Sequence, residues 1–278
     1  MTRPRLPPGF AERVRQLASG EISAAPARDA STVALLRDGR QGPEVYLLRR
    51  VKGMAFAGGM HVFPGGSVDP ADATADIAWA GPPPSVWATA FACDEPLARA
   101  LVCAAVRETF EESGVLLAGP DVDEVLADVS TDEWEAERAA LEAREHSMSE
   151  LLARRSLVLR SDLLRPLAHW ITPEVESKRF DTRFFLARMP DGQACREVGG
   201  EADERLWLRP ADALSSADQP GGTNLMPPTA AVLEDLAAHP DVDSALAATR
   251  ILRTVMPSAR IADDGSVELL VQDEPDPA

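Results

Sequence analysis

Three glutamates lie close together in the segment RETFEESG at residues 107–114, namely Glu108, Glu111 and Glu112. Side chains three and four positions apart are neighbours on a helix, so Glu108 shares a face with both of the others. Like charges at this spacing and anions in the last turn both disfavour a helix. A divalent cation would relieve the repulsion, and Mg²⁺ prefers oxygen ligands of this kind. The segment is therefore either a solvated acidic helix end or part of a metal site.

A glycine-rich segment, VFPGG at residues 62–66, precedes the glutamates in the chain. Because Gly65 and Gly66 have no Cβ atom, their backbone can closely approach a ligand or a metal ion. An ordinary tight turn is the alternative interpretation of the same residues. The whole stretch 53–66 predicts an irregular, closely packed loop.

Together, these two segments resemble the signature of the Nudix hydrolases, G-x5-E-x7-R-E-U-x-E-E-x-G-U, in which U is a bulky apolar residue. Gly66 opens the pattern, and its second half is matched by Arg107, Glu108, Glu111, Glu112, Gly114 and Val115. The glycine and the arginine are 14 positions apart in the signature but 41 apart here, which indicates an insertion of about 27 residues. Counted back from Arg107, the first glutamate of the signature falls on Arg99, and Thr109 stands at an apolar position.

A long insertion inside the signature is similar to the coenzyme A diphosphatase-like branch of this family. Further stretches resemble that branch, namely LLRR (47–50), GGMHVFPGGSVDP (58–70), WITPE (170–174), RFDTRFFLA (179–187) and PPT (227–229). The coenzyme A motif of that branch has a serine and an arginine where this chain has Val51 and Ala55. The missing arginine is a group that could have paired with a phosphate.

The resemblance implies metal-dependent hydrolysis of a nucleoside diphosphate linked to another moiety. The leading expectation is coenzyme A or acyl-coenzyme A, cleaved to 3′,5′-ADP and (acyl-)phosphopantetheine. A diphosphatase for ADP-ribose or NADH is the alternative within the same class. A nucleotide-binding regulatory module without catalysis is the alternative from another class, and Arg99 at an acidic position motivates it.

The resemblance also implies roles for individual residues. The expected ligands of Mg²⁺ or Mn²⁺ are Glu108, Glu112, Glu111 and the carbonyl group of Gly65. Arg107 is expected to hold a catalytic carboxylate through charge-assisted hydrogen bonds. The general base is expected either in the signature, as Glu111, or in a later loop, as Glu201 or Glu204. The expected substrate-binding residues are Arg50, Phe63 and Gly66.

An anionic substrate needs cations in a chain with a net charge of −17. The cations near the motif segments are Arg49, Arg50, Lys52, Lys178, Arg179 and Arg183, of which Arg50 is the first choice. Phe63 and Phe184 could contact a base or a pantetheine arm, although aromatic residues that alternate along a strand usually belong to the core. A structural role is expected for the isolated His61 and His169.

The elements that must position these residues follow from the pattern of apolar residues. Strands are predicted at 31–39, 44–50, 115–119, 167–172, 179–189 and 204–210, with further strands around an Asp-Gly turn within 250–271. Helices are predicted at 97–113 with Gly114 as its cap, at 210–216, at 228–239, and once or twice on the surface within 131–156. The expected fold class is α/β, as a Nudix-type α/β/α sandwich with a mixed sheet and additional helices.

The expected organisation has three parts. Residues 1–29 form an N-terminal extension, and 30–215 form the hydrolase domain. Within that domain, 67–95 is an insertion with a short helical piece, which the proline run at 82–84 breaks. Residues 216–278 add helices and strands packed on the same domain.

The composition narrows the class of protein. The 278 residues include 45 acidic and 28 basic side chains, which argues against binding to a nucleic-acid backbone. Cys93, Cys103 and Cys195 form no C-x-x-C pair, so neither a disulfide framework nor a structural zinc site is expected. No apolar run approaches about 18 residues, and the first ten lack an apolar signal core. We therefore expect a cytoplasmic protein with a small-molecule substrate and no membrane association, for which a homodimer is an open option.

Overall fold

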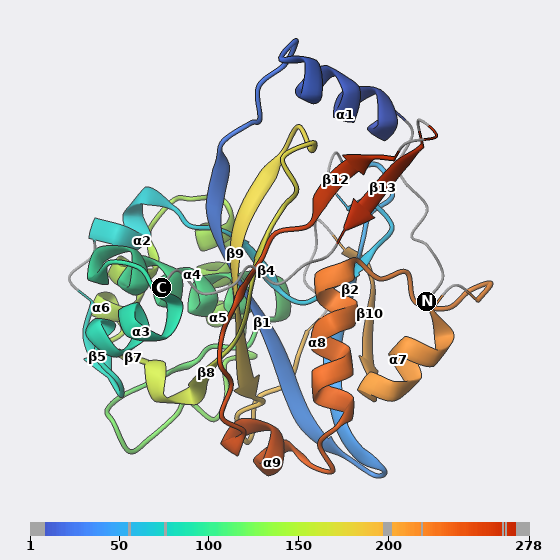
Figure 1. Cartoon of the computed structure of the whole chain (residues 1–278). Coiled ribbons are helices and arrows are strands. Elements are labelled where there is room, and N and C mark those ends of the chain that lie inside the picture. The colour runs from blue at the N-terminus through green and yellow to red at the C-terminus, as the bar shows by residue number, and fades with distance from the viewer. Residues whose placement is uncertain are drawn as a thin grey trace.

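A computed structural model describes residues 9–54, 57–74, 77–196, 202–217, 219–262, 264 and 266–270. Its main sheet has the strand order β10-β2-β1-β9-β8-β11, with β3 beside β2 and β4 beside β1 (Figure 1). The bounds are β1 Ala27–Gly39, β2 Gly42–Arg50, β3 His61–Val62, β4 Gly65–Ser67, β8 Leu164–Ile171, β9 Arg179–Arg188, β10 Ala202–Leu208 and β11 Thr254–Val255. The β1–β9 and β8–β11 pairs are parallel and the other pairs antiparallel, so the predicted mixed sheet is confirmed.

Alternate residues of the central strand β1 face two different cores, because successive side chains of a strand point to opposite sides. Val33 and Leu35 belong to the core beneath α4 (Glu95–Ser113). Ala34 and Leu36 belong to the core beneath α7 (Pro210–Ser216), α8 (Pro227–Ala237) and α9 (Val242–Ala247). Helices therefore cover both faces of the sheet, as the predicted α/β/α sandwich requires.

The helix predicted at 97–113 is α4, and its ends explain its length. Asp94 caps the first turn, because its carboxylate accepts a hydrogen bond of 2.8 Å from the backbone N–H of Leu97. Gly114 ends the helix in the left-handed conformation, with φ of 73°, as predicted. The alanine- and valine-rich middle of the helix, residues 100–106, is fully buried, so α4 is a rigid support for the glutamates at its C-terminal end.

The insertion at 67–95 forms regular structure. It contains α2 (Pro70–Thr74), β5 (Trp79–Ala80) and α3 (Pro84–Phe91). The expectation that the proline run breaks structure is wrong at its last member, because Pro84 begins α3, a position where proline is favoured. Strand β5 joins a small sheet with β7 (Val158–Arg160) and β6 (Ala118–Gly119). The 3₁₀ turn η1 (Ser161–Leu163) follows β7.

The predicted helical region 131–156 is two helices, α5 (Asp132–Glu142) and α6 (Met148–Arg154). They are less superficial than expected, since Leu141, Leu151 and Leu152 join the core beneath α4. Strands within 250–271 are also confirmed, as β11 and as the hairpin of β12 (Ser258–Ile261) and β13 (Val267–Leu270).

The N-terminal segment, expected as an extension, contains regular structure. Residues Phe10–Ser19 form α1, and β1 already begins at Ala27. Phe10 and Val14 bury one face of α1 against Val175 and against the β12–β13 hairpin, which lies beside α1 in Figure 1. No helix among the described residues is both long and apolar enough to cross a membrane.

Candidate active site

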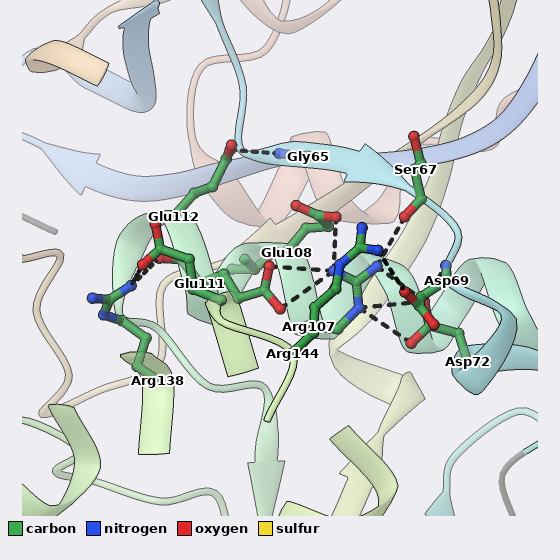
Figure 2. Close-up of polar contacts among 12 residues, drawn as sticks. Gly65, Ser67, Asp69, Asp72, Arg107, Glu108, Glu111, Glu112, Arg138 and Arg144 are labelled. Atoms are coloured by element: carbon green, nitrogen blue, oxygen red, sulfur yellow. Dashed lines mark hydrogen bonds and ion pairs between the residues drawn. The ribbon is translucent and has the colours of Figure 1, made fainter. Parts of the chain in front are cut away.

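Arg107 lies at the centre of an acidic cluster at the C-terminal half of α4 (Figure 2). Its guanidinium donates hydrogen bonds to Glu108 at 2.8 Å and to both oxygens of Glu111 at 3.2 and 3.3 Å. It also donates to the carbonyl oxygen of Ser67 at 2.9 Å and to the carboxylate of Asp72 at 3.0 Å. The arginine thus ties α4 to β4 and α2, and orders two of the three glutamates predicted as ligands.

Asp72 is a member of this cluster that the sequence analysis missed. The signature places its first glutamate six residues after the opening glycine. Counted forward from Gly66, that position is Asp72. Its side chain is 3% exposed and contacts Arg107, whereas Arg99 lies 5.5 Å from the ring of Trp79. The carboxylate assigned as missing is therefore present as an aspartate, and the inserted residues begin after α2 rather than at residue 67.

The two glycines of the VFPGG segment lie where side chains cannot fit. A Cβ atom on Gly66 would lie 2.4 Å from Oε1 of Glu108, and one on Gly65 would lie 2.5 Å from the carbonyl oxygen of Ser31. The backbone N–H of Gly65 donates a hydrogen bond of 2.8 Å to Glu112. The backbone of the segment therefore lies directly against Glu108 and Glu112 of α4, and the Gly65 N–H fixes the position of Glu112.

Burial and mutual repulsion shift the acidities in the cluster. Burial, followed by the charge of Glu108, raises the pKa of Glu111 to about 7 against the opposing effect of Arg107. Burial likewise raises the pKa of Asp72, although its hydrogen bond to Arg107 acts in the opposite direction. The pKa of Arg107 is raised as well, because the charges of Glu108 and Asp72 together outweigh its burial. One permanent cation thus serves three carboxylates.

Arg138 of α5 supports the same helix end from below, and sequence reasoning placed it on a surface helix. Its side chain is 4% exposed and donates a hydrogen bond of 2.9 Å to the backbone carbonyl of Glu111. Its charge is compensated by Glu135 and Glu142. A cation at a helix C-terminus stabilises the exposed carbonyl groups, which offsets part of the cost of placing glutamates there.

A cavity of about 1830 Å³ opens above the cluster, lined by Glu108, Glu111, Glu112, Gly65 and Gly66. Arg50, the preferred substrate-binding cation, also lines it, as do Phe63 and Phe184. Both phenylalanines are nevertheless buried in the core beneath α8, as their strand pattern predicts. In Figure 1, α2, β4 and α5 lie near α4, and all four elements contribute residues to the lining of the cavity.

Glu204 does not line this cavity in the described part of the chain. Strand β10 places it opposite Arg49, and the two side chains form an ion pair at 2.7 Å. Its carboxylate also lies 3.6 Å from Nε2 of His61, which is buried. The structure therefore brings Arg107 and Glu111 together but leaves Glu204 in a separate pair, and Glu201 lies outside the described residues.

The donor chemistry of the cluster fits a hard divalent cation. Three carboxylates share one guanidinium, and the raised pKa of Glu111 shows that further negative charge there is unfavourable. Within the residues described, no three acidic, histidine or cysteine side chains already surround a common point that could hold a metal ion. Oxygen ligands suitable for such a cation are present in Glu108, Glu111, Glu112 and the carbonyl of Gly65. In this structure the carboxylate of Glu112 accepts a hydrogen bond from the Gly65 N–H.

A second charge cluster, around the buried Arg183, involves other residues that the sequence singled out. Arg183 forms ion pairs with Asp181 at 2.6 Å and with Asp29 at 3.1 Å. Nε2 of His169 lies 2.5 Å from Asp181, and Nδ1 lies 2.9 Å from the hydroxyl of Thr254. The structural role expected for His169 agrees with this network, which joins β1, β8, β9 and β11. Arg183 is therefore engaged within the sheet rather than in the cavity.

Comparisons with known proteins agree with this geometry. Residues 88–232 match the family model described as the NUDT19 Nudix domain. Proteins named acyl-coenzyme A diphosphatase NUDT19 are similar, at 27% identity over 67% of this chain and 62% of the protein from Gallus gallus, and at 26% over 62% and 54% for Xenopus laevis. The chain thus spans less than two thirds of these curated relatives. The crystal structure of a NUDIX hydrolase from Alicyclobacillus acidocaldarius superimposes with a TM-score of 0.70 at 32% identity, covering 82% of this chain and 98% of that one.

Proposed function

This chain belongs to the Nudix hydrolase family, whose members typically depend on divalent metals, and from that premise we propose that it hydrolyses coenzyme A or an acyl-coenzyme A. Water would attack one phosphorus of the diphosphate, and the bridging P–O bond would break. The products would be 3′,5′-ADP and phosphopantetheine, or its acylated form. The observation that carries the proposal is the Arg107 cluster facing Gly65 and Gly66 at one end of a large cavity.

Each residue of the cluster has a role in this reaction. A bound Mg²⁺ or Mn²⁺ would neutralise the diphosphate and increase the acidity of water, with Glu108, Glu111, Glu112 and the Gly65 carbonyl as its proposed ligands. Arg107 orients Glu108 and Glu111 through its hydrogen bonds. Glu111 is also the proposed acceptor of the proton of the attacking water, because it lines the cavity beside Glu108 and Arg107 fixes its direction.

The apolar part of the cavity supports a substrate with a long arm. Its lining includes Trp170, Ile171, Phe180, Pro257 and Leu269 as well as Phe10 of α1. Such a surface suits the pantetheine or acyl portion of the substrate, while Arg50 and Lys178 of the same lining suit phosphates. The names of the similar proteins from Gallus gallus and Xenopus laevis support the same substrate class.

A substrate panel with metal tests the proposal. The purified protein with Mn²⁺ should release 3′,5′-ADP from coenzyme A and acyl-coenzyme A faster than it cleaves ADP-ribose or NADH, as followed by chromatography of the products. Faster cleavage of ADP-ribose or NADH would contradict coenzyme A as the substrate but would retain diphosphate hydrolysis as the reaction. Tight nucleotide binding with no turnover of any of the four compounds would instead support the non-catalytic module.

A further inference from the structure

We propose that Arg144, in the connection between α5 and α6, binds the diphosphate of the substrate opposite the glutamates of α4. This inference rests on the proposed function and names a residue that lies outside the Nudix signature. Arg144 lines the cavity together with Glu108, Glu111 and Asp69. In Figure 2 its side chain reaches Asp69, which precedes α2, although Arg144 comes from the connection after α5.

The backbone around Arg144 forms a turn that normally uses glycine. The N–H of Arg144 donates to the carbonyl of Leu141, and the N–H of Glu145 donates to the carbonyl of Ala140, both at 2.8 Å. This pair of bonds defines a Schellman motif at the end of α5, with Arg144 at its left-handed position and φ of 57°. Glycine takes this conformation without strain, whereas a residue with a Cβ atom does not. An arginine at this position therefore costs stability that a glycine would not.

The contacts of Arg144 do not offset that strain. Its side chain is 83% exposed, and the nearest oxygen of its partner Asp69 is 3.7 Å away. An exposed ion pair of this length contributes little to folding. By contrast, Arg138 in the same helix is almost fully buried and holds the backbone of Glu111. The stability of the fold thus explains Arg138 but not Arg144.

The position of Arg144 on the cavity wall gives a reason for an arginine at this turn, namely its positive charge. A dianionic diphosphate that enters the cavity meets an excess of carboxylates around Arg107. A guanidinium on the cavity wall can pair with phosphate oxygens through two parallel N–H groups. Because Asp69 holds Arg144 loosely and near the cluster, the side chain can exchange this partner for a phosphate without a change in the backbone.

The test compares wild type, R144G, R144K and S156G in steady-state hydrolysis of coenzyme A with Mn²⁺. R144G should raise KM about tenfold and change kcat by less than about threefold, because the contact is made equally in the ground and transition states. R144K should recover part of the affinity. The melting temperature of R144G should equal or exceed that of wild type, since glycine relieves the turn. A KM for R144G within twofold of wild type would overturn the inference.

Two controls separate the contact from other effects. Ser156 occupies the same left-handed position after α6, outside the cavity lining, so S156G should relieve strain and leave KM unchanged. Dephospho-coenzyme A lacks the 3′-phosphate and should show the same tenfold rise in KM with R144G. A rise confined to coenzyme A would place Arg144 at the 3′-phosphate and contradict the assignment to the diphosphate.

Failure of the proposed function is distinguishable from failure of this inference. If wild type cleaves no coenzyme A, the function proposal fails, and calorimetric titration with ADP in the presence of Mn²⁺ tests Arg144 by itself. R144G should then bind ADP about tenfold more weakly than wild type and S156G. Equal affinities would contradict the role of Arg144 whether or not the chain is an enzyme.

Discussion

The clusters around Arg107 and Arg183 both bury arginines, yet they differ in charge balance. Arg107 faces three carboxylates, and burial with repulsion raises the pKa of Glu111 to about 7. Arg183 faces two, Asp29 and Asp181, and His169 also contacts Asp181. Concentrated like charge of this kind is more typical of a functional site than of a structural one, which supports the proposed metal site at Arg107.

The response of the acids shows the same contrast. The pKa of Asp181 is lowered although burial alone would raise it, because His169 and Arg183 both stabilise its charged form. In the other cluster, the single arginine does not prevent a rise in the pKa of Asp72 or Glu111. Burial raises the pKa of Asp29, the other acid of the Arg183 cluster, so the contrast concerns Asp181, which both Arg183 and His169 contact.

The largest expected effect is the loss of catalysis in E112Q. The amide keeps an oxygen that can accept the Gly65 N–H, so the fold should be retained, but the charge needed to hold a divalent cation is removed. We expect kcat to fall by at least about 100-fold, with the melting temperature within about 2 °C of wild type. Turnover within threefold of wild type would remove Glu112 from the proposed ligands.

The next effect distinguishes the two clusters by stability. R107A leaves Asp72, Glu108 and Glu111 without their arginine, which should lower the free energy of unfolding by about 3–5 kcal/mol. R183A should cost less, because Asp29 is 41% exposed and Asp181 keeps its contact with His169. Addition of Mn²⁺ should restore most of this loss in R107A, because a bound cation replaces the missing charge, but little of it in R183A. Urea unfolding with and without Mn²⁺ measures both, and equal responses to the metal would contradict the contrast between the clusters.

A smaller effect concerns the pH dependence of stability. Because the folded protein raises the pKa of Glu111 from 4.5 to about 7, native Glu111 keeps its proton where the unfolded chain has lost it. Glu111 therefore reduces stability progressively as the pH rises from about 4.5 to about 7, by roughly 3 kcal/mol in total. E111Q should remove this loss, so its free energy of unfolding without metal should exceed that of wild type increasingly up to pH 7. A difference that is constant with pH would contradict the assignment.

The smallest effect tests which residue completes the signature. R99A removes only a cation–π contact with Trp79, so it should cost less than about 1 kcal/mol and leave kcat/KM within twofold of wild type. D72N, by contrast, should lower kcat/KM by at least about tenfold, because Arg107 loses the carboxylate that fixes its direction. Steady-state assays measure kcat/KM for both variants. A larger loss in R99A than in D72N would contradict the assignment of Asp72 to the first glutamate of the signature.

The sequence predicted most of the strands and the central helix because each has a strong local pattern. Helix α4 has apolar residues at helical spacing and a glycine cap, and both features survive in the structure. Helix α1 was missed because prolines and charges precede it and because only Phe10 and Val14 are buried. What stabilises α1 is contact with the β12–β13 hairpin, more than two hundred residues later, which a local pattern does not contain.

The sequence predicted those site residues that are close to one another in the chain, but not those that tertiary packing brings from distant segments. The spacing of Glu108, Glu111 and Glu112 fixes their common helix face. Asp72 was obscured because the insertion changes the distance to Arg107, although the distance from Gly66 is kept. Arg138 and Arg144 come from α5 and the turn after it, and only the packing of that helix beneath α4 brings them to the cluster. The placement of Glu204 beside Arg49 likewise depends on the register between β10 and β2.

The parallel pairing of β1 with β9 has a consequence for the order of folding. Ala27 pairs with Arg179, so β1 leaves the ribosome roughly 150 residues before its central partner exists. At about 5–20 residues per second, this delay lasts about 8–30 s. During that time β1 can pair with β2 and β4 on one side, but its edge toward β9 has no partner strand. This open strand edge therefore makes the nascent chain most prone to aggregation before β9 is made.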